Sequence, residues 1–195
     1  MMTCDKIVDL RTYSSINNSK AFFLDTNILY WYTYPRFSLP GQLSSSAKIY
    51  YDFVDSLTAA GNPLFTSVYN LSELLNVIEK NEYDIYCKTT PGIHITRKDF
   101  RKIFVEREKV KQMMQTSLNN AKQVCTVSDF NFSTDSITKF VDTLLEHRCD
   151  IFDYEILLNC IQTNCLNIIS DDSDFSTMEK IVLYTANEKI LPNRK

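Results

Sequence analysis

Short apolar runs that stop at a polar tip constrain the fold of this chain more than any other feature. The clearest is Ala-Phe-Phe-Leu at 21–24, which ends abruptly at Asp25. Consecutive apolar residues of this length are typical of a strand buried on both faces of a parallel sheet. Further short strands are predicted at 64–66, 166–170 and 181–184. Because helical segments separate them, the chain is predicted to form an α/β fold with a mainly parallel sheet.

The helical segments are recognised by apolar residues that recur at intervals of three and four. They are predicted near 49–57, from Val68 to Ile78 with Ser67 as a cap, over 97–120, from Asp135 to Leu145, and over 153–165. In the fourth of these, the stripe that is expected to face the core contains Ile137, Phe140, Val141, Leu144 and Leu145. Residues 82–96 lack such spacing and are predicted to be irregular, with a turn at Pro91-Gly92.

Composition excludes several classes of protein. A chain of 195 residues with 44% hydrophobic content has enough apolar surface for one packed domain. Its net charge of −3 excludes a polycation, so contact with nucleic acid requires a local basic patch. The six cysteines include no C-x-x-C pair, which favours a reducing compartment. Because no apolar run approaches the roughly 20 residues that span a bilayer, we expect a cytoplasmic protein with no membrane partner.

Acidic residues gather where ligands bind in α/β folds. Asp171, Asp172 and Asp174 directly follow the strand predicted at 166–170, and Asp25 ends the first strand. Ligands of open α/β sheets bind at the carboxyl ends of the strands. Closely packed carboxylates repel one another, and a hard divalent cation such as Mg²⁺ or Mn²⁺ is the usual solution.

Each acid also has an ordinary structural interpretation. Asp150 is a suitable helix N-cap, and Asp153 is then a first-turn acid that the helix dipole favours, although it lies on the face of Ile156 and Leu157. Glu73 lies away from the apolar face of its helix, which is typical of a solvated surface residue. Only the combination of segments separates these interpretations.

Together, the segments resemble a PIN domain. The resemblance is carried by Asp25-Thr26-Asn27 after an apolar strand, Ser67 to Glu73 at the start of a helix, Asp153 on an apolar helix, and Ser170-x-Asp172-x-Asp174-Phe175 after a strand. It covers about 21–80 and 135–185. It implies a three-layer α/β/α sandwich around a mainly parallel sheet. It also implies a single PIN-like domain over 1–195, with an N-terminal extension at 1–20 and a helical insertion at about 82–125.

The family resemblance implies a metal-dependent ribonuclease, with toxins of the VapC type among its members. Carried over residue by residue, it implies catalytic and metal-binding roles for Asp25, Glu73, Asp153, Asp172 and Asp174, supported by Asn27 and Ser170. Two cations about 3.5–4 Å apart can activate water and hold a phosphodiester between such carboxylates. The chain departs from the family pattern where Tyr154-Glu155 replaces small residues and where Asp171 adds an acid.

The implied function is hydrolysis of phosphodiester bonds in single-stranded RNA by a Mg²⁺- or Mn²⁺-dependent endoribonuclease. A toxin-type nuclease admits an antitoxin-like protein partner, and the family also admits a homodimer. The alternative is a catalytically idle PIN-like module that binds or scaffolds. A phosphatase of the haloacid dehalogenase type requires Asp where Asn27 stands, and no spacing supports a metal-free ribonuclease built on His94 and His147.

Two further features have open interpretations. The segment 97–111 carries a local charge of +4, so Arg97, Lys98, Arg101 and Lys102 are candidates for nucleic-acid binding, with an ordinary solvated helix face as the alternative. The aromatic cluster Tyr30-Trp31-Tyr32 with Tyr34 is suited either to stacking unpaired bases or to packing in the core or at an interface.

Overall fold

The computed structural model describes residues 6–13, 16, 19–39, 41–129, 133–146 and 148–191. Within these ranges one sheet contains six strands: β1 (Lys6–Asp9), β2 (Phe22–Leu24), β3 (Leu64–Ser67), β4 (Thr126–Ser128), β5 (Asn167–Ile169) and β6 (Val182–Thr185). Their order is β1-β6-β5-β2-β3-β4, and each described pair of neighbours is parallel. The prediction of an α/β fold with a mainly parallel sheet is therefore confirmed.

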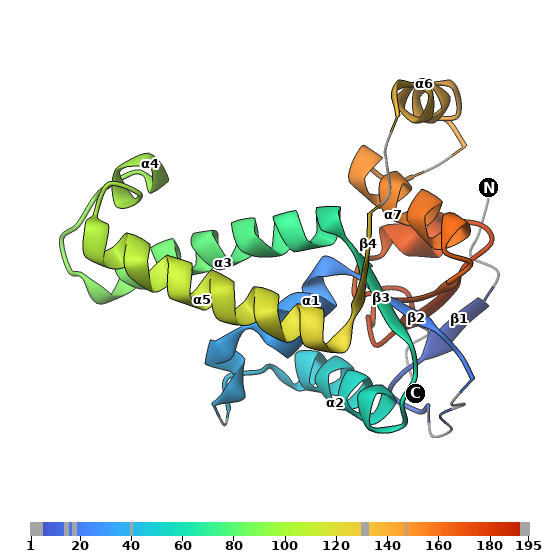
Figure 1. The fold of residues 1–195 in the computed structure, drawn as a ribbon, viewed down its shortest axis with the longest axis horizontal. Helices are drawn as coiled ribbons and strands as arrows, with labels where there is room; N and C mark the ends of the chain where they lie inside the picture. Colours follow the sequence, from blue (N-terminus) through green and yellow to red (C-terminus); the bar gives the residue numbers. More distant parts are fainter. Residues whose placement is uncertain are drawn as a thin grey trace.

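Helices cover both faces of this sheet (Figure 1). They are α1 (Thr26–Thr33), α2 (Ser45–Ala59), α3 (Val68–Thr89), α4 (Arg97–Phe100), α5 (Phe104–Val124), α6 (Thr134–Asp142) and α7 (Ile151–Gln162), with 3₁₀ turns at Pro35–Ser38 and Asp174–Thr177. Side chains of a strand alternate between the two faces. Accordingly, Phe22 and Leu24 of β2 pack into one core with α1 and α2, whereas Phe23 packs into a second core with α7. This arrangement forms the three predicted layers.

The central strand β2 determines where a site can form. Its two neighbours are β3, which follows it in the chain, and β5, which comes much later. Such a change of direction in strand order leaves a crevice at the carboxyl ends of the two strands. Asp25 follows β2 and Ser170 follows β5, so both residues lie at this crevice.

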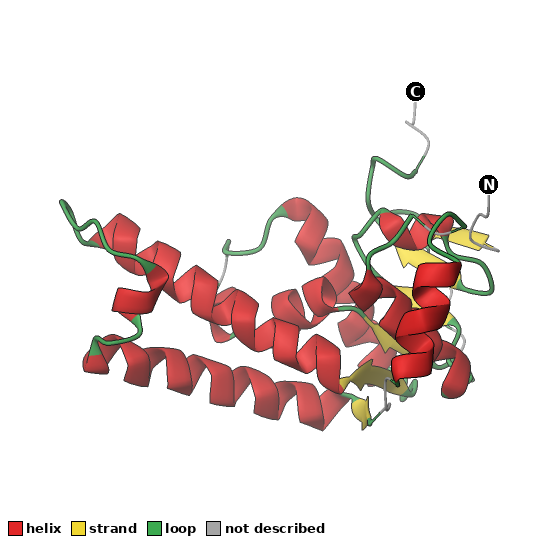
Figure 2. Ribbon diagram, turned by 90° about the horizontal axis from the view of Figure 1, so that it is seen from above, coloured by secondary structure: helices red, strands yellow, loops and turns green. Residues whose placement is uncertain are grey.

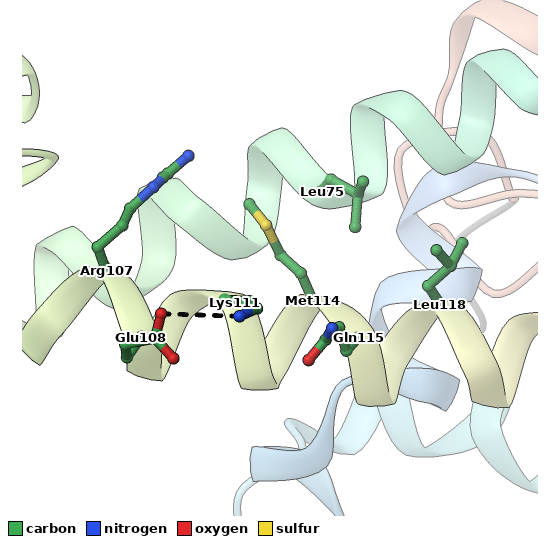
Figure 3. A pocket seen from close by; sticks show the side chains of 7 residues that line it. All are labelled: Leu75, Arg107, Glu108, Lys111, Met114, Gln115 and Leu118. Atoms are coloured by element: carbon green, nitrogen blue, oxygen red, sulfur yellow. Dashed lines mark ion pairs between the residues drawn. The ribbon is translucent and has the colours of Figure 1, made fainter. Parts of the chain in front are cut away.

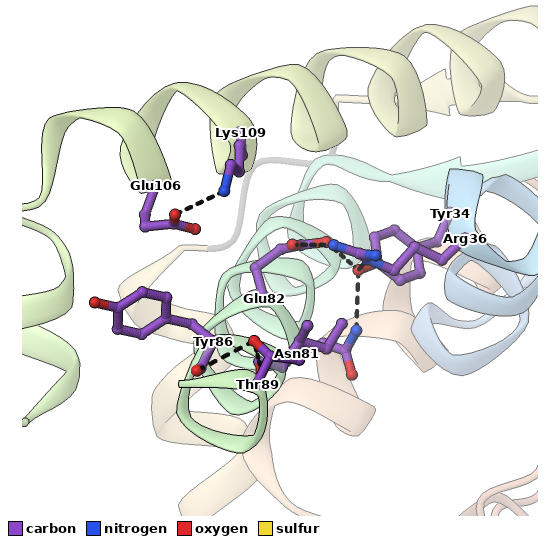
Figure 4. A network of polar contacts seen from close by, with 9 residues as sticks. Tyr34, Arg36, Asn81, Glu82, Tyr86, Thr89, Glu106 and Lys109 are labelled. Carbon is purple, nitrogen blue, oxygen red and sulfur yellow. Dashed lines mark hydrogen bonds and ion pairs between the residues drawn. The ribbon is translucent and has the colours of Figure 1, made fainter. Parts of the chain in front are cut away.

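Two long helices, α3 and α5, extend together away from the strands (Figure 2). The prediction that residues 82–96 are irregular is wrong for the first half of this range, because α3 continues to Thr89. The extension is stabilised from outside the helix. The carboxylate of Glu82 is buried, and it accepts hydrogen bonds from Arg36 Nε at 2.8 Å and from Tyr34 Oη (Figure 4). These partners are distant in sequence, so helical periodicity alone does not reveal them.

Other local predictions need correction. The single helix expected over 97–120 is two helices, because the chain turns between α4 and α5 at Arg101–Ile103. Strand β4 was not predicted. Nor was β1, which lies within the expected N-terminal extension, of which 1–5, 14–15 and 17–18 are outside the described residues. Both strands are short and lie at the edges of the sheet, where backbone pairing with one neighbour positions them without a strong apolar pattern.

The expected core-facing stripe of α6 is also wrong. Phe140 contacts Tyr154 of α7 at a ring-centroid distance of 5.2 Å. In contrast, Ile137, Val141, Leu144 and Leu145 are exposed, the last completely. Among the described residues, α6 thus contacts α7 through Phe140, while the rest of its predicted apolar stripe faces solvent.

The aromatic cluster after β2 packs within the protein. Tyr34 is buried and stacks on Tyr30 at 5.1 Å between ring centroids. Trp31 contacts Tyr50, and Tyr32 contacts Tyr51, both across the α1–α2 interface. The packing interpretation therefore holds for these rings in the structure.

Candidate active site

Asp25 occupies the centre of the crevice and is 6% exposed. One carboxylate oxygen, Oδ2, accepts hydrogen bonds from Ser170 Oγ at 2.6 Å and from Asn27 Nδ2 at 2.7 Å. The other, Oδ1, accepts the backbone N–H of Thr26 at 2.7 Å. The sequence places these groups together because Asp25 caps α1 and Ser170 follows the adjacent strand.

Burial controls the charge of Asp25. It raises the pKa of this carboxyl from 3.8 to about 7, although Ser170 and the backbone of Thr26 favour the ionised form, and the charges of Glu73 and Asp172 raise it further. A positive charge at the crevice would reverse the shift. Asp25 therefore exchanges a proton near neutral pH in the absence of a cation.

The other predicted acids line a pocket of about 410 Å³ beside Asp25. Glu73 comes from the second turn of α3 and Asp153 from the first turn of α7. Asp172 comes from the loop after β5, and Asp174 begins the 3₁₀ turn that follows this loop. The hydroxyl of Thr26 joins this pocket to Asp25, because it donates to Glu73 Oε2 at 2.6 Å. Tertiary structure thus gathers around one pocket four carboxylates that are separated by up to about a hundred residues of sequence.

The environment of the pocket is strongly negative. The pKa of Asp153 is raised to about 8, mainly by burial and then by the charges of Asp150, Asp25 and Asp172. The pKa of Asp174 is raised for the same two reasons. Neither lysine nor arginine is among the described residues that line the pocket. Its carboxylates therefore repel one another without an internal counter-charge.

Two residues that lie at the site were not predicted as site residues from the sequence. Asn70 is buried, and its Nδ2 lies 3.2 Å from Thr26 Oγ1 and 3.4 Å from Asp25 Oδ1. Its position three residues after the cap Ser67 and three before Glu73 was the available signal. Asp150 is the N-cap of α7, as its ordinary interpretation proposed, and it also lines the pocket. Capping and proximity to the site are compatible roles for this side chain.

Asp171 lies elsewhere. Its Oδ1 accepts a hydrogen bond from Tyr50 Oη at 2.7 Å, and its side chain does not line the acidic pocket. Its backbone N–H, by contrast, points to the site and donates to Asn27 Oδ1 at 3.3 Å. The carboxylate of this additional acid therefore forms a hydrogen bond to α2 and does not face the pocket.

The basic candidates lie on the α3–α5 extension, outside the acidic pocket. Arg101 pairs with Glu79, Arg97 approaches the same carboxylate at 4.0 Å, and Lys102 pairs with Asp99. Lys98 is exposed. A separate apolar cavity of about 340 Å³ between α3 and α5 contains none of the predicted site residues; Leu75, Met114 and Leu118 form much of its lining (Figure 3).

The donor chemistry of the acidic pocket fits a hard divalent cation, because carboxylate oxygens are the preferred ligands of Mg²⁺ and Mn²⁺. Burial raises the pKa values of Asp25 and Asp153, and the charges of neighbouring carboxylates raise them further. The spacing of these side chains is less favourable for binding a cation. Within the described ranges, no three side chains of His, Cys, Asp or Glu are close enough together to form a ready ligand set.

Comparisons with known proteins add little to this geometry. No family model matches the chain, and no curated protein matches it. Among solved structures, the chain is similar to VapBC2 from Rickettsia felis bound to a DNA fragment from the promoter. The identity is 15%, the TM-score is 0.48, and the alignment covers 84% of this chain and 96% of the other. In the part of the chain that the structure describes, no helix is both long and apolar enough to traverse a bilayer.

Proposed function

We propose that this chain is a ribonuclease that hydrolyses phosphodiester bonds of single-stranded RNA with a divalent cation. One observation carries the proposal: Glu73, Asp153, Asp172 and Asp174 line one pocket beside the buried Asp25 at the carboxyl ends of β2 and β5. An acidic pocket without basic residues attracts cations and repels phosphates. It is therefore suited to a reaction in which Mg²⁺ or Mn²⁺ separates the carboxylates from the substrate.

The proposal gives five acids a ligand role and two polar side chains an orienting role. Glu73, Asp153, Asp172 and Asp174 are the proposed ligands at the pocket, and Asp25 is the proposed ligand from the floor of the crevice. Ser170 and Asn27 orient the carboxylate of Asp25 through hydrogen bonds of 2.6 and 2.7 Å. The chemistry supplied by a bound cation is neutralisation of charge at the phosphate and activation of water. No histidine is among the described residues that line the pocket, and no protein nucleophile enters the proposal. His147 lies outside the described residues.

Free thiols support an intracellular setting. Cys87, Cys125, Cys149, Cys160 and Cys165 form no disulfide in the structure. Free thiols persist in reducing compartments, so we place the activity in the cytoplasm. An antitoxin-like partner and a homodimer stay predictions of the family resemblance.

The alternative is a catalytically idle binding or scaffold module. It is favoured by one observation, the lack of a ready three-residue metal ligand set among the described residues. The two functions differ in whether the acids are needed for turnover.

Cleavage of a mixed pool of single-stranded RNA with Mg²⁺, Mn²⁺ or chelator distinguishes them. The variants are Asp25→Asn and Asp172→Asn, and the matched control is Asp171→Asn, whose carboxylate binds Tyr50 outside the pocket. We expect cation-dependent cleavage that both site variants abolish and the control retains. Folded wild-type protein that neither cleaves RNA nor binds either cation by calorimetry contradicts the nuclease and supports the scaffold.

A further inference from the structure

Three of the seven basic side chains of segment 97–111 pair with acids of the same segment. Lys102 pairs with Asp99 at 2.8 Å, Lys109 with Glu106 at 2.7 Å, and Lys111 with Glu108 at 3.7 Å. These three ion pairs use all the acids of the segment. The remaining positive charge belongs to Arg97, Arg101, Arg107 and Lys98.

The three arginines converge on one carboxylate. Glu79 of α3 is buried, and Arg101 donates from Nε to both of its oxygens at 3.0 Å. Arg107 reaches Glu79 from α5, and its side chain points toward α3 in Figure 3. Arg97 lies at 4.0 Å from the same carboxylate. The guanidinium of Arg101 holds the pKa of Glu79 below its ordinary value, so this carboxylate is ionised at neutral pH.

One carboxylate cannot neutralise three guanidinium groups. The side chains of Arg97, Arg101 and Arg107 are 42%, 41% and 48% exposed. Each guanidinium has five N–H donors in a planar fork that matches the geometry of phosphate oxygens. The cluster therefore presents excess charge and free donors to solvent. We call Arg97, Arg101 and Arg107 the arginine cluster.

The arginine cluster and the acidic pocket share a face of α3. Ser72 lines the pocket, and Glu79 follows it by seven residues, which is two helical turns and about 10 Å along the same face. Lys80 has the same relation to Glu73 and is exposed. Figure 1 shows α4, which carries Arg97, near the end of α3 that is far from the sheet, and α7, which carries Asp153, near the start of α3. A chain of phosphates that leaves the pocket along this face would meet Lys80 and then the arginine cluster.

We propose that the arginine cluster, with Lys80, binds the phosphate backbone of the single-stranded nucleic acid that enters the acidic pocket. The inference rests on the proposed function, because it assigns the substrate of the same site an anchor outside it. Such an anchor offsets the repulsion between phosphates and the pocket acids. Phe104, which is 76% exposed at the start of α5, adds an aromatic surface for a base near the cluster. An acidic protein segment has no base to stack on that ring, and the acids of the pocket would repel it.

The test measures binding without cleavage. A fluorescent single-stranded RNA oligonucleotide is titrated with the full chain in chelator, and affinity is read by anisotropy at 50 and 200 mM salt. The variant is Arg97→Gln with Lys80→Gln, which leaves the Arg101 and Arg107 contacts to Glu79 intact. The control, Lys48→Gln with Lys122→Gln, removes the same charge from exposed positions on α2 and at the end of α5.

Each phosphate contact to a single strand contributes a factor of about 2.6 to the loss of affinity between these two salt concentrations. We therefore expect the variant to bind more weakly at the lower salt and to lose about sevenfold less affinity across the range, with the control like wild type. Equal binding by variant and control overturns the inference. So does displacement of the RNA by poly-glutamate at equal charge concentration, because it indicates an acidic protein as the partner.

The outcomes separate this inference from the proposed nuclease. Wild-type protein that binds RNA through the arginine cluster but cleaves nothing with Mg²⁺ or Mn²⁺ contradicts the nuclease alone. Metal-dependent cleavage with variant binding equal to the control contradicts the anchor alone.

Discussion

Asp25 should make the stability of the protein depend on pH in a way that one substitution removes. The carboxyl has a pKa of about 7 in the folded chain and an ordinary value of 3.8. Below the lower value it is protonated in both states and contributes nothing. Between the two values the folded state holds the proton and the unfolded state does not, so stability falls as pH rises. Above the folded value the full penalty of the buried charge is present.

The magnitude follows from the two pKa values. Each unit of difference corresponds to about 1.4 kcal/mol of unfolding free energy. Integrated between pH 5 and pH 8, the contribution of Asp25 is a loss of about 2.5 kcal/mol. Replacing Asp25 by Asn abolishes this titration. It also disturbs the hydrogen bonds of Ser170 and Asn27, at a cost of about 1–3 kcal/mol that does not depend on pH.

The assay is urea unfolding of wild type and Asp25→Asn in chelator at both pH values. The quantity to compare is the stability difference between the two proteins at pH 8 minus that at pH 5, in which the constant cost cancels. We expect the variant to gain about 2.5 kcal/mol on wild type over this range. Asp52→Asn is the baseline, because this carboxylate is exposed on α2 and pairs with Lys48. A double difference no larger than that of Asp52→Asn refutes the assignment of a buried, titrating carboxyl to Asp25.

Three further predictions test the surroundings. Ser170→Ala removes the hydroxyl that favours the ionised form of Asp25, so the pKa of Asp25 should rise by about 1–2 units. The pH at which RNA cleavage begins to rise should increase by the same amount, and an unshifted pH profile contradicts this role of Ser170. Tyr34→Phe leaves Glu82 with Arg36 but without its phenol donor and should lower unfolding free energy in urea by about 1–3 kcal/mol, whereas a neutral result shows that Arg36 alone satisfies the carboxylate. Leu74→Ala should lower the unfolding free energy by about 2–5 kcal/mol in the same assay, because Leu74 is fully buried. Leu145→Ala should change it by no more than about 0.5 kcal/mol, because Leu145 is fully exposed; similar losses for both variants would mean that the segment after α6 is covered.

Local patterns were sufficient for the centre of the sheet. The run before Asp25 forms β2, Ser67 caps α3 by accepting the N–H of Asn70, and Asp150 caps α7. Each of these features depends on interactions between residues a few positions apart, so a short stretch of sequence is enough to predict it. Parallel neighbours of β2 then follow from the alternation of strands with helices.

Contacts between distant segments decided the rest. Residues 82–89 are helical because Glu79 and Glu82 are buried against arginines from the turn between α4 and α5, from α5 and from the 3₁₀ turn after α1. The apolar stripe of α6 predicted a core position, yet most of it is exposed.

The sequence by itself determined which residue types reach the carboxyl ends of β2 and β5, because capping and strand patterns act over a few residues. Only the tertiary structure decided which acids share a pocket. It turned Asp171 to Tyr50, added Asp150 and Asn70 to the site, and grouped Arg107 rather than Lys102 with Arg97 and Arg101. The physical reason is that burial and charge pairing depend on distances in space, and a carboxylate binds whichever cation or donor the packed helices bring within hydrogen-bonding range.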